Sequence, residues 1–351
     1  MLRHHEAIGT PTPTPEQAPP PPRDAPPLHP AAPPPAGAGA RPRLLAWIGV
    51  AVSLLAVAAV VWWATRQQAP PLPHTPREIL ALAAAIALYG VATVVRGERW
   101  RRLLADEGGA PSRGDSLGIV TVGYAGNNIL PARAGDAVRV LLMAPRAGTS
   151  MRSVVGTLVA ERLLDVAVLV VLFVVVGWGL LGTVGSERVE LLAGLAVAAV
   201  VLAVAGWRLA QRSERVHGFL APIASATLGL RRAHHGLRLV AMTVVIWAIE
   251  TAVWMSVAGA IGFGVGPIEG AYLVALASVF SMIPSGPAYA GTQDAAAIIG
   301  IKAVGGTGAQ AVAYIVMLRF VIVVPITIAG LALLAVRYGG LRRLRTARKR
   351  A

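Results

Sequence analysis

The sequence contains no cysteine. It therefore has no disulfide bonds, thiolate metal ligands, cysteine nucleophiles or palmitoylation sites, and it is not a disulfide-stabilised secreted scaffold. Charged residues are scarce as well, at 14% of the chain, whereas a soluble globular domain carries about 25%. Hydrophobic residues make up 55%. Because too few polar side chains are present to cover a water-exposed surface, we expect an integral membrane protein.

Lysine is almost absent: of the 32 Lys and Arg residues, only Lys302 and Lys349 are lysines. The net charge of +15 does not predict nucleic-acid binding, because the arginines lie in short segments between long uncharged runs. Such charges set membrane orientation. The sequence has no Walker phosphate-binding loop, H-E-x-x-H motif or Cys/His cluster. We therefore predict no cofactor, no metal site, no nucleic-acid partner and no enzymatic activity.

Half of the 26 prolines lie within residues 1–40. This segment has too little apolar surface to offset the entropy of ordering, so it is predicted to be a disordered cytoplasmic tail. A transmembrane domain is predicted over residues 41–337, followed by a basic cytoplasmic tail over residues 338–351.

Six long apolar runs predict full membrane spans. They cover residues 44–64, 79–95, 166–186, 191–207, 239–268 and 303–336. At 1.5 Å per residue, about 20 residues cross a hydrocarbon core of about 30 Å. The positive-inside rule assigns the arginine-rich segments to the cytoplasm, including a loop after residue 95 that holds Arg96 and Arg99. Both termini of this multi-pass protein are therefore predicted to be cytoplasmic. The protein itself is expected in the inner (plasma) membrane of a bacterium.

Two other apolar segments are interrupted by polar residues, proline and glycine. They are 116–145, broken around Asn127, Asn128 and Pro131, and 270–301, broken at Pro284, Ser285, Gly286 and Pro287. One alternative is that proline and glycine only kink ordinary transmembrane helices. Two interrupted segments that enter from opposite faces instead indicate a transporter site near the midplane.

The parity of the spans favours the second interpretation. The loop after residue 95 is inside, and residues 182–190 are outside after a single span over 154–181. Segment 116–145 must therefore begin and end on the cytoplasmic side, and by the same count segment 270–301 must begin and end outside. The predicted fold class is all-α and polytopic, with about six full transmembrane helices and two broken or re-entrant helical hairpins entering from opposite sides.

The densest polar stretch of the membrane portion surrounds the first break. Arg133, Asp136 and Arg139 recur at a spacing of three, so they share one face of the following half-helix. Two guanidinium groups flanking a carboxylate suit a phosphate or another anion, because arginine presents a planar fork of donors. We predict lipid head-group binding by Arg133, Arg139, Asn127 and Asn128. The alternative for Arg139 is a position at the interface, with its side chain extended to water.

A gating or bracing role is predicted for Asp136, Glu161, Arg162, Asp165, Glu250 and Arg319. Glu161 and Asp165 lie four residues apart on one helix face and repel each other unless a cation separates them. Arg133 or Arg139 is the expected cation, and a purely structural ion pair between helices is the alternative. Glu250 and Arg319 are isolated in apolar runs, so both should face the bundle interior. Their mutual pairing is a guess that the sequence does not fix.

The hairpin breaks are assigned to Pro131, Pro284, Gly286, Pro287 and Asp294. Asp294 is expected to begin or close the returning half of the second hairpin. Asp294 lies seven residues beyond Pro287.

The stretch from Gly126 to Arg139, with Asn127-Asn128 and Pro131-Ala132-Arg133 inside it, is followed by Glu161-Arg162-x-x-Asp165. This pattern resembles the flippase-like transmembrane domain of the lysylphosphatidylglycerol synthase family. The segment 283–287 with Asp294 resembles a second, looser signature, from which the chain departs by lacking the usual Pro-Gly-Gly order. The resemblance covers roughly residues 77–336 and implies a stand-alone member without the soluble synthase domain.

In the synthases that this chain resembles, the membrane part moves the lipid product between leaflets. The resemblance therefore implies a protein that translocates or binds an anionic lipid, either an aminoacyl-phospholipid or a polyprenyl-linked lipid. The alternative is a non-transporting scaffold or accessory subunit of a cell-envelope glycosyltransferase or aminoacyl-lipid synthase. The expected partners are membrane lipids and a separate aminoacyltransferase or glycosyltransferase.

Overall fold

The computed structural model describes residues 72–130, 133–180, 233–281 and 287–340, together with scattered positions between 55 and 67. Within these ranges the regular structure is helical and no strand occurs, which confirms the predicted all-α class. The described helices are α2 (Pro76–Asp106), α3 (Arg113–Ile129), α4 (Ala134–Ala147), α5 (Met151–Leu180), α8 (Ala233–Ala260), α9 (Pro267–Phe280), the 3-10 helix η3 (Pro287–Tyr289), α10 (Thr292–Ala303) and α11 (Gly308–Val336). The chain divides into two units, 1–41 and 42–351, and these helices all belong to the second.

Three of the described helices are long and apolar enough to cross a membrane: α2, the part of α8 from Gly236 to Ala260, and α11. They correspond to three of the predicted spans, although α8 ends at Ala260 and does not continue to residue 268. Helix α5 corresponds to the predicted span 154–181. The run 191–207 and most of the run 44–64 lie outside the described residues, so the count of six full spans stays a prediction.

Helix α2 continues well beyond the predicted end of its apolar run. It begins at Pro76, where the side chains of Thr75 and Glu78 form a capping box, and it ends at Asp106. Arg96 and Arg99 therefore lie on a helix, and their assignment to a loop was wrong. The apolar run stops at the first charge, whereas the helix does not, because both arginines find carboxylate partners inside the bundle.

The first broken segment doubles back, as predicted. Helices α3 and α4 lie against each other, and their open ends are joined where the Ala110 N–H donates to the Ala147 carbonyl at 3.0 Å. The two backbones approach closely through glycine: a Cβ on Gly126 would lie 2.7 Å from the Cα of Gly135. The turn runs from Leu130, which is extended, to Arg133, which is left-handed with φ 53°. Pro131 lies outside the described residues.

The second broken segment has the same design. Helices α9 and α10 pack together, and a Cβ on Gly300 would lie 2.5 Å from a Leu273 methyl group. Pro287 begins the short helix η3 between them, and Pro284 and Gly286 fall outside the described residues. Asp294 lies in the first turn of α10, where its carboxylate accepts from the Gly291 N–H at 2.8 Å. Asp294 therefore lies at the start of the returning half and not at its close.

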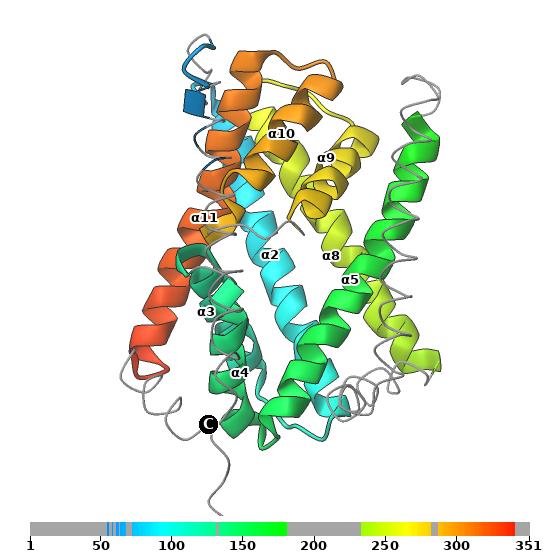
Figure 1. The fold of residues 1–351 in the computed structure, drawn as a ribbon, viewed down its shortest axis with the longest axis vertical. Coiled ribbons are helices and arrows are strands. Elements are labelled where there is room, and N and C mark those ends of the chain that lie inside the picture. The colour runs from blue at the N-terminus through cyan, green and yellow to red at the C-terminus, as the bar shows by residue number, and fades with distance from the viewer. Residues whose placement is uncertain are drawn as a thin grey trace, which may run out of the picture. The chain divides into compact units, whose positions relative to one another are not determined.

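Figure 1 shows how the two hairpins are arranged among the long helices. The α3–α4 hairpin occupies the lower half of the view and the α9–α10 hairpin the upper half, while α2, α5, α8 and α11 run alongside both. The hairpin tips meet near mid-height, where a guanidinium nitrogen of Arg133 donates to the Ser281 carbonyl at 2.8 Å. Four long helices thus hold two short hairpins tip to tip.

The buried apolar side chains form separate clusters around the two hairpins. One cluster packs α8, α9, α10 and α11 together and includes Trp254, Leu273 and Tyr314. Another packs α3 and α4 against α2 and α5 and includes Trp100, Ile119 and Met143. Since each hairpin has its own apolar support, the polar residues at the tips are held between two packed regions.

Candidate functional site

A cavity of about 190 Å³ lies between the hairpin tips. Its charged lining residues are Arg96, Arg133, Arg162, Asp165 and Glu250. Its aromatic lining residues are Tyr89, Tyr124, Trp247, Trp254 and Tyr289, and its neutral polar ones include Asn127, Asn128, Ser278, Ser281 and Gln293. The cavity is smaller than the roughly 300–1,000 Å³ of a site for a drug-sized ligand. It therefore has room for a compact polar group but not for a whole lipid.

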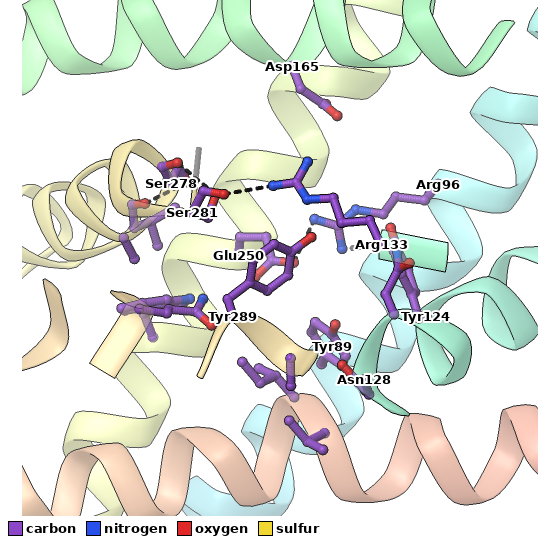
Figure 2. Close-up of a pocket in the computed structure, with 18 of the residues that line it drawn as sticks. Tyr89, Arg96, Tyr124, Asn128, Arg133, Asp165, Glu250, Ser278, Ser281 and Tyr289 are labelled. Carbon is purple, nitrogen blue, oxygen red and sulfur yellow. Dashed lines mark hydrogen bonds and ion pairs between the residues drawn. The ribbon is translucent and has the colours of Figure 1, made fainter. Parts of the chain in front are cut away.

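Arg133 joins the two hairpins across this cavity, as Figure 2 shows. Its guanidinium donates to the Ser281 carbonyl and lies 4.8 Å from the ring centroid of Tyr289. Among the described residues, no carboxylate forms a salt bridge with Arg133. Arg133 also has a left-handed backbone, with φ 53°. At a residue other than glycine this conformation costs about 1–3 kcal/mol and is typical of functional sites. The predicted head-group residue is thus an arginine with no acidic partner in the described part of the chain.

The other charges of the cavity are neutralised within the protein. Arg96 and Glu250 pair at 2.6 Å, and both side chains are largely buried. Arg162 lies 3.5 Å from Asp136 at the start of α4. Asp165 on α5 is held by Arg99 at 2.7 Å. These pairs leave Arg133 as the cavity arginine best placed to accept an external anion.

Behind the cavity lies a buried ion network that ties α2, α4 and α5 together. Arg99 is fully buried and lies between Asp165, at 2.7 Å, and Glu161, at 4.0 Å. Arg139 is also buried and pairs with Glu161 at 2.9 Å, while its guanidinium stacks 4.2 Å from the Trp100 ring. The cation that lies near both Glu161 and Asp165 is therefore Arg99, and of the two expected cations Arg139 pairs with Glu161 alone, whereas Arg133 pairs with neither.

Arg139 does not line the cavity, and so it is not in contact with the space where we expected it to bind a head group. It also does not extend to water, because only 1% of its side chain is exposed. Arg99 was missed because a charge after an apolar run looks like a loop residue. A signal was nevertheless present, since Arg96 and Arg99 are three apart and share a face if the helix continues.

The two asparagines at the first hairpin tip have different neighbours. The amide of Asn128 donates to the Thr327 hydroxyl on α11 at 2.9 Å, which ties the tip to a long helix. The amide of Asn127 lies 3.4 Å from an oxygen of Asp136, across the hairpin turn. Both residues line the cavity, and their role as head-group ligands stays a prediction.

Glu250 and Arg319 do not pair with each other, contrary to the guess made from the sequence. Glu250 pairs with Arg96, as described above, and Arg319 pairs with Asp294 at 2.7 Å. The guanidinium of Arg319 also donates to the carbonyls of Ala288 and Tyr289, two left-handed residues of the second hairpin turn. Arg319 thus stabilises the broken backbone of the second hairpin from α11. Within the described ranges, no group of three or more metal-ligating side chains occurs.

Comparison with known proteins agrees with this architecture. The family described as the lysylphosphatidylglycerol synthase TM region matches residues 46–330. The chain belongs to this membrane family. It is also similar to "Glycosyltransferase AglD" of Haloferax volcanii, with 36% identity over 84 residues, which is 24% of this chain. The matched segment amounts to 14% of that relative's length.

Proposed function

We propose that this protein binds the phosphate-bearing head group of an anionic lipid in the cavity between its hairpin tips and moves that lipid between leaflets. One observation carries the proposal: Arg133 lines the cavity at the junction of the two hairpins and has no carboxylate partner in the described part of the chain. Arginine matches the oxygens of a phosphate with two parallel hydrogen bonds. Membership of a membrane family and the pair of broken segments support a transport site.

The contact between Arg133 and Ser281 supplies a mechanism. This charge-assisted hydrogen bond ties the two hairpin tips together. A phosphate carries negative charge and accepts two parallel hydrogen bonds from a guanidinium, whereas the neutral Ser281 carbonyl accepts one here. A bound head group therefore draws the guanidinium away from Ser281 and frees the tips to separate. The arginine-rich end of the bundle, at which α2 ends and α5 begins, would face the cytoplasm of an inner-membrane protein.

The test is a leaflet-quenching assay on proteoliposomes that carry fluorescently labelled phosphatidylglycerol. We expect Arg133→Ala to slow lipid movement about 10- to 100-fold, since a hydrogen bond to a charged group contributes about 1.5–3 kcal/mol. Arg133→Lys should be intermediate, because it keeps the charge but loses the planar fork.

The matched control is Arg113→Ala. This side chain is 84% exposed at the start of α3, at the open end of the same hairpin. We expect it to transport at the parental rate. If Arg133→Ala moves lipid as fast as the parent protein, the proposed role of Arg133 fails.

A second candidate function is that of an accessory membrane subunit for a glycosyltransferase or an aminoacyl-lipid synthase. The observation that favours it is the similarity to a protein named as a glycosyltransferase. Purified protein that moves no lipid but copurifies with one stoichiometric transferase would support this function over transport. In both cases we expect the chain itself to catalyse no reaction.

A further inference from the structure

The carboxylates of the cavity indicate whether the head group carries an amine beside its phosphate. Glu250 is engaged by Arg96 at 2.6 Å, and both oxygens of Asp165 are engaged by Arg99, at 2.7 and 3.2 Å. An ammonium group needs acceptors for three donors, and a buried one needs a negative partner. The charge of each acid is already neutralised by an arginine, and the nearby arginines would repel the ammonium. The site is therefore unsuited to an amine-bearing head group.

Unlike the carboxylates, some neutral polar groups of the cavity have no hydrogen-bond partner among the described residues. The indole N–H of Trp247 on α8 and the amide oxygen of Gln293 on α10 are buried and make no hydrogen bond within the described part of the chain. The amide oxygen of Asn127, a residue only 7% exposed, is also unpaired. Buried polar groups in native proteins are nearly always hydrogen-bonded, so unpaired ones require an explanation. All three residues line the same cavity.

A hydroxyl group can satisfy both kinds of unpaired atom. It accepts a hydrogen bond from an N–H such as that of Trp247 and donates one to a carbonyl oxygen such as that of Gln293. An alkyl group can do neither, and an ammonium group can only donate. The unpaired atoms thus match a ligand that carries several hydroxyls beside its phosphate.

We propose that the head group is a phosphodiester of an uncharged polyol, such as glycerol, inositol or a sugar, and that Trp247 and Gln293 recognise its hydroxyls. This inference rests on the proposed function, since it takes Arg133 as the phosphate ligand of the same cavity. It selects between the two lipid classes that the sequence left open. An aminoacyl head group is disfavoured, and a hydroxyl-rich, glycosyl-phosphate type is favoured.

The test compares four lipids that share dioleoyl tails and a phosphodiester but differ in the attached group. They are phosphatidylethanol, phosphatidylethanolamine, phosphatidylglycerol and phosphatidylinositol, titrated into the detergent-purified full chain and measured by native mass spectrometry. We expect phosphatidylglycerol and phosphatidylinositol to bind about tenfold more tightly than phosphatidylethanol, which corresponds to one or two hydrogen bonds. Phosphatidylethanolamine should bind most weakly.

Trp247→Phe keeps an aromatic ring and removes only the N–H donor. We expect it to reduce the preference for phosphatidylglycerol over phosphatidylethanol to about twofold and to leave phosphatidylethanol binding unchanged, which also reports that the variant is folded. Trp62→Phe is the matched control, because Trp62 is 59% exposed and does not line the cavity. It should keep the full preference.

The outcomes separate the two proposals. Equal binding of phosphatidylethanol and phosphatidylglycerol, or tight binding of phosphatidylethanolamine, would overturn the polyol inference while Arg133 keeps its role. An unchanged preference in Trp247→Phe would do the same, and would mean that ordered water satisfies the unpaired groups. If Arg133→Ala weakens the binding of none of the four lipids, the proposed function itself fails.

Discussion

Arg99 is the residue whose removal should most damage the bundle. Its guanidinium is fully buried, bonds both oxygens of Asp165, lies 4.0 Å from Glu161 and donates to the Thr243 hydroxyl at 2.8 Å. Arg99→Gln would leave the buried Glu161 and the partly buried Asp165 with one fewer cation between them. Breaking a buried pair by removing one partner costs about 3–5 kcal/mol. That is a large part of a typical unfolding free energy of about 5–15 kcal/mol.

Arg101→Gln provides a matched control two residues further along α2. Arg101 pairs with Glu98 at 2.8 Å, but the two side chains are 26% and 23% exposed. A solvent-accessible pair contributes only about 0–1 kcal/mol. Equilibrium unfolding by sodium dodecyl sulfate in mixed micelles, followed by the fluorescence of the eight tryptophans, measures both variants on the same scale.

The reasoning also predicts a partial rescue. Asp165→Asn in the Arg99→Gln background should restore some stability, because it removes one of the uncompensated negative charges. If Arg99→Gln unfolds at the same detergent fraction as Arg101→Gln, the buried network does not stabilise the fold. If the double variant is less stable than Arg99→Gln alone, the charge argument is wrong and the loss comes from packing.

Two other predictions concern packing and topology. Gly330→Ala on α11 should lose about 1–3 kcal/mol of unfolding free energy, because its Cβ would lie 2.6 Å from the Thr121 carbonyl oxygen. The control is Gly90→Ala, whose Cβ would meet nothing within 4 Å. It should be neutral or slightly stabilising in the same detergent titration. The membrane topology can be tested with single cysteines introduced into this cysteine-free chain. A membrane-impermeant maleimide should label positions 113 and 152 from one face of the membrane and position 264 from the other. Labelling of 113 and 152 from opposite faces would refute the first hairpin.

The arrangement of the two broken hairpins was predictable from the sequence. The breaks carry their own local signals, namely a proline-containing Asn-Asn turn and a Pro-Ser-Gly-Pro turn within apolar segments. Counting the spans between arginine-rich loops then required each segment to return to its starting side. The sequence left open whether Asp294 begins or closes a half-helix; it lies in the first turn of α10, where an acidic residue commonly stabilises a helix N-terminus.

The partners of the buried charges could not be predicted in the same way. Asp165 pairs with Arg99 and Glu250 with Arg96, and these partners are 66 and 154 positions distant in the sequence. Hydropathy assigned these two arginines to a loop, since it ends a span at the first charge. Whether a charge is tolerated inside a membrane bundle depends on the helix that packs against it.

The sequence by itself determined that the chain is a helical membrane protein with two interrupted hairpins, because hydropathy, turn residues and loop charge are local properties. Tertiary structure alone decided which cavity arginine has no carboxylate partner among the residues that the structure describes. Arg133 and Arg139 were both predicted as head-group ligands, but Glu161 on the neighbouring helix neutralises Arg139, whereas Arg133 contacts the Ser281 carbonyl and the Tyr289 ring within the described ranges. The physical reason is that pairing energies depend on distances between helices, which a local pattern does not encode.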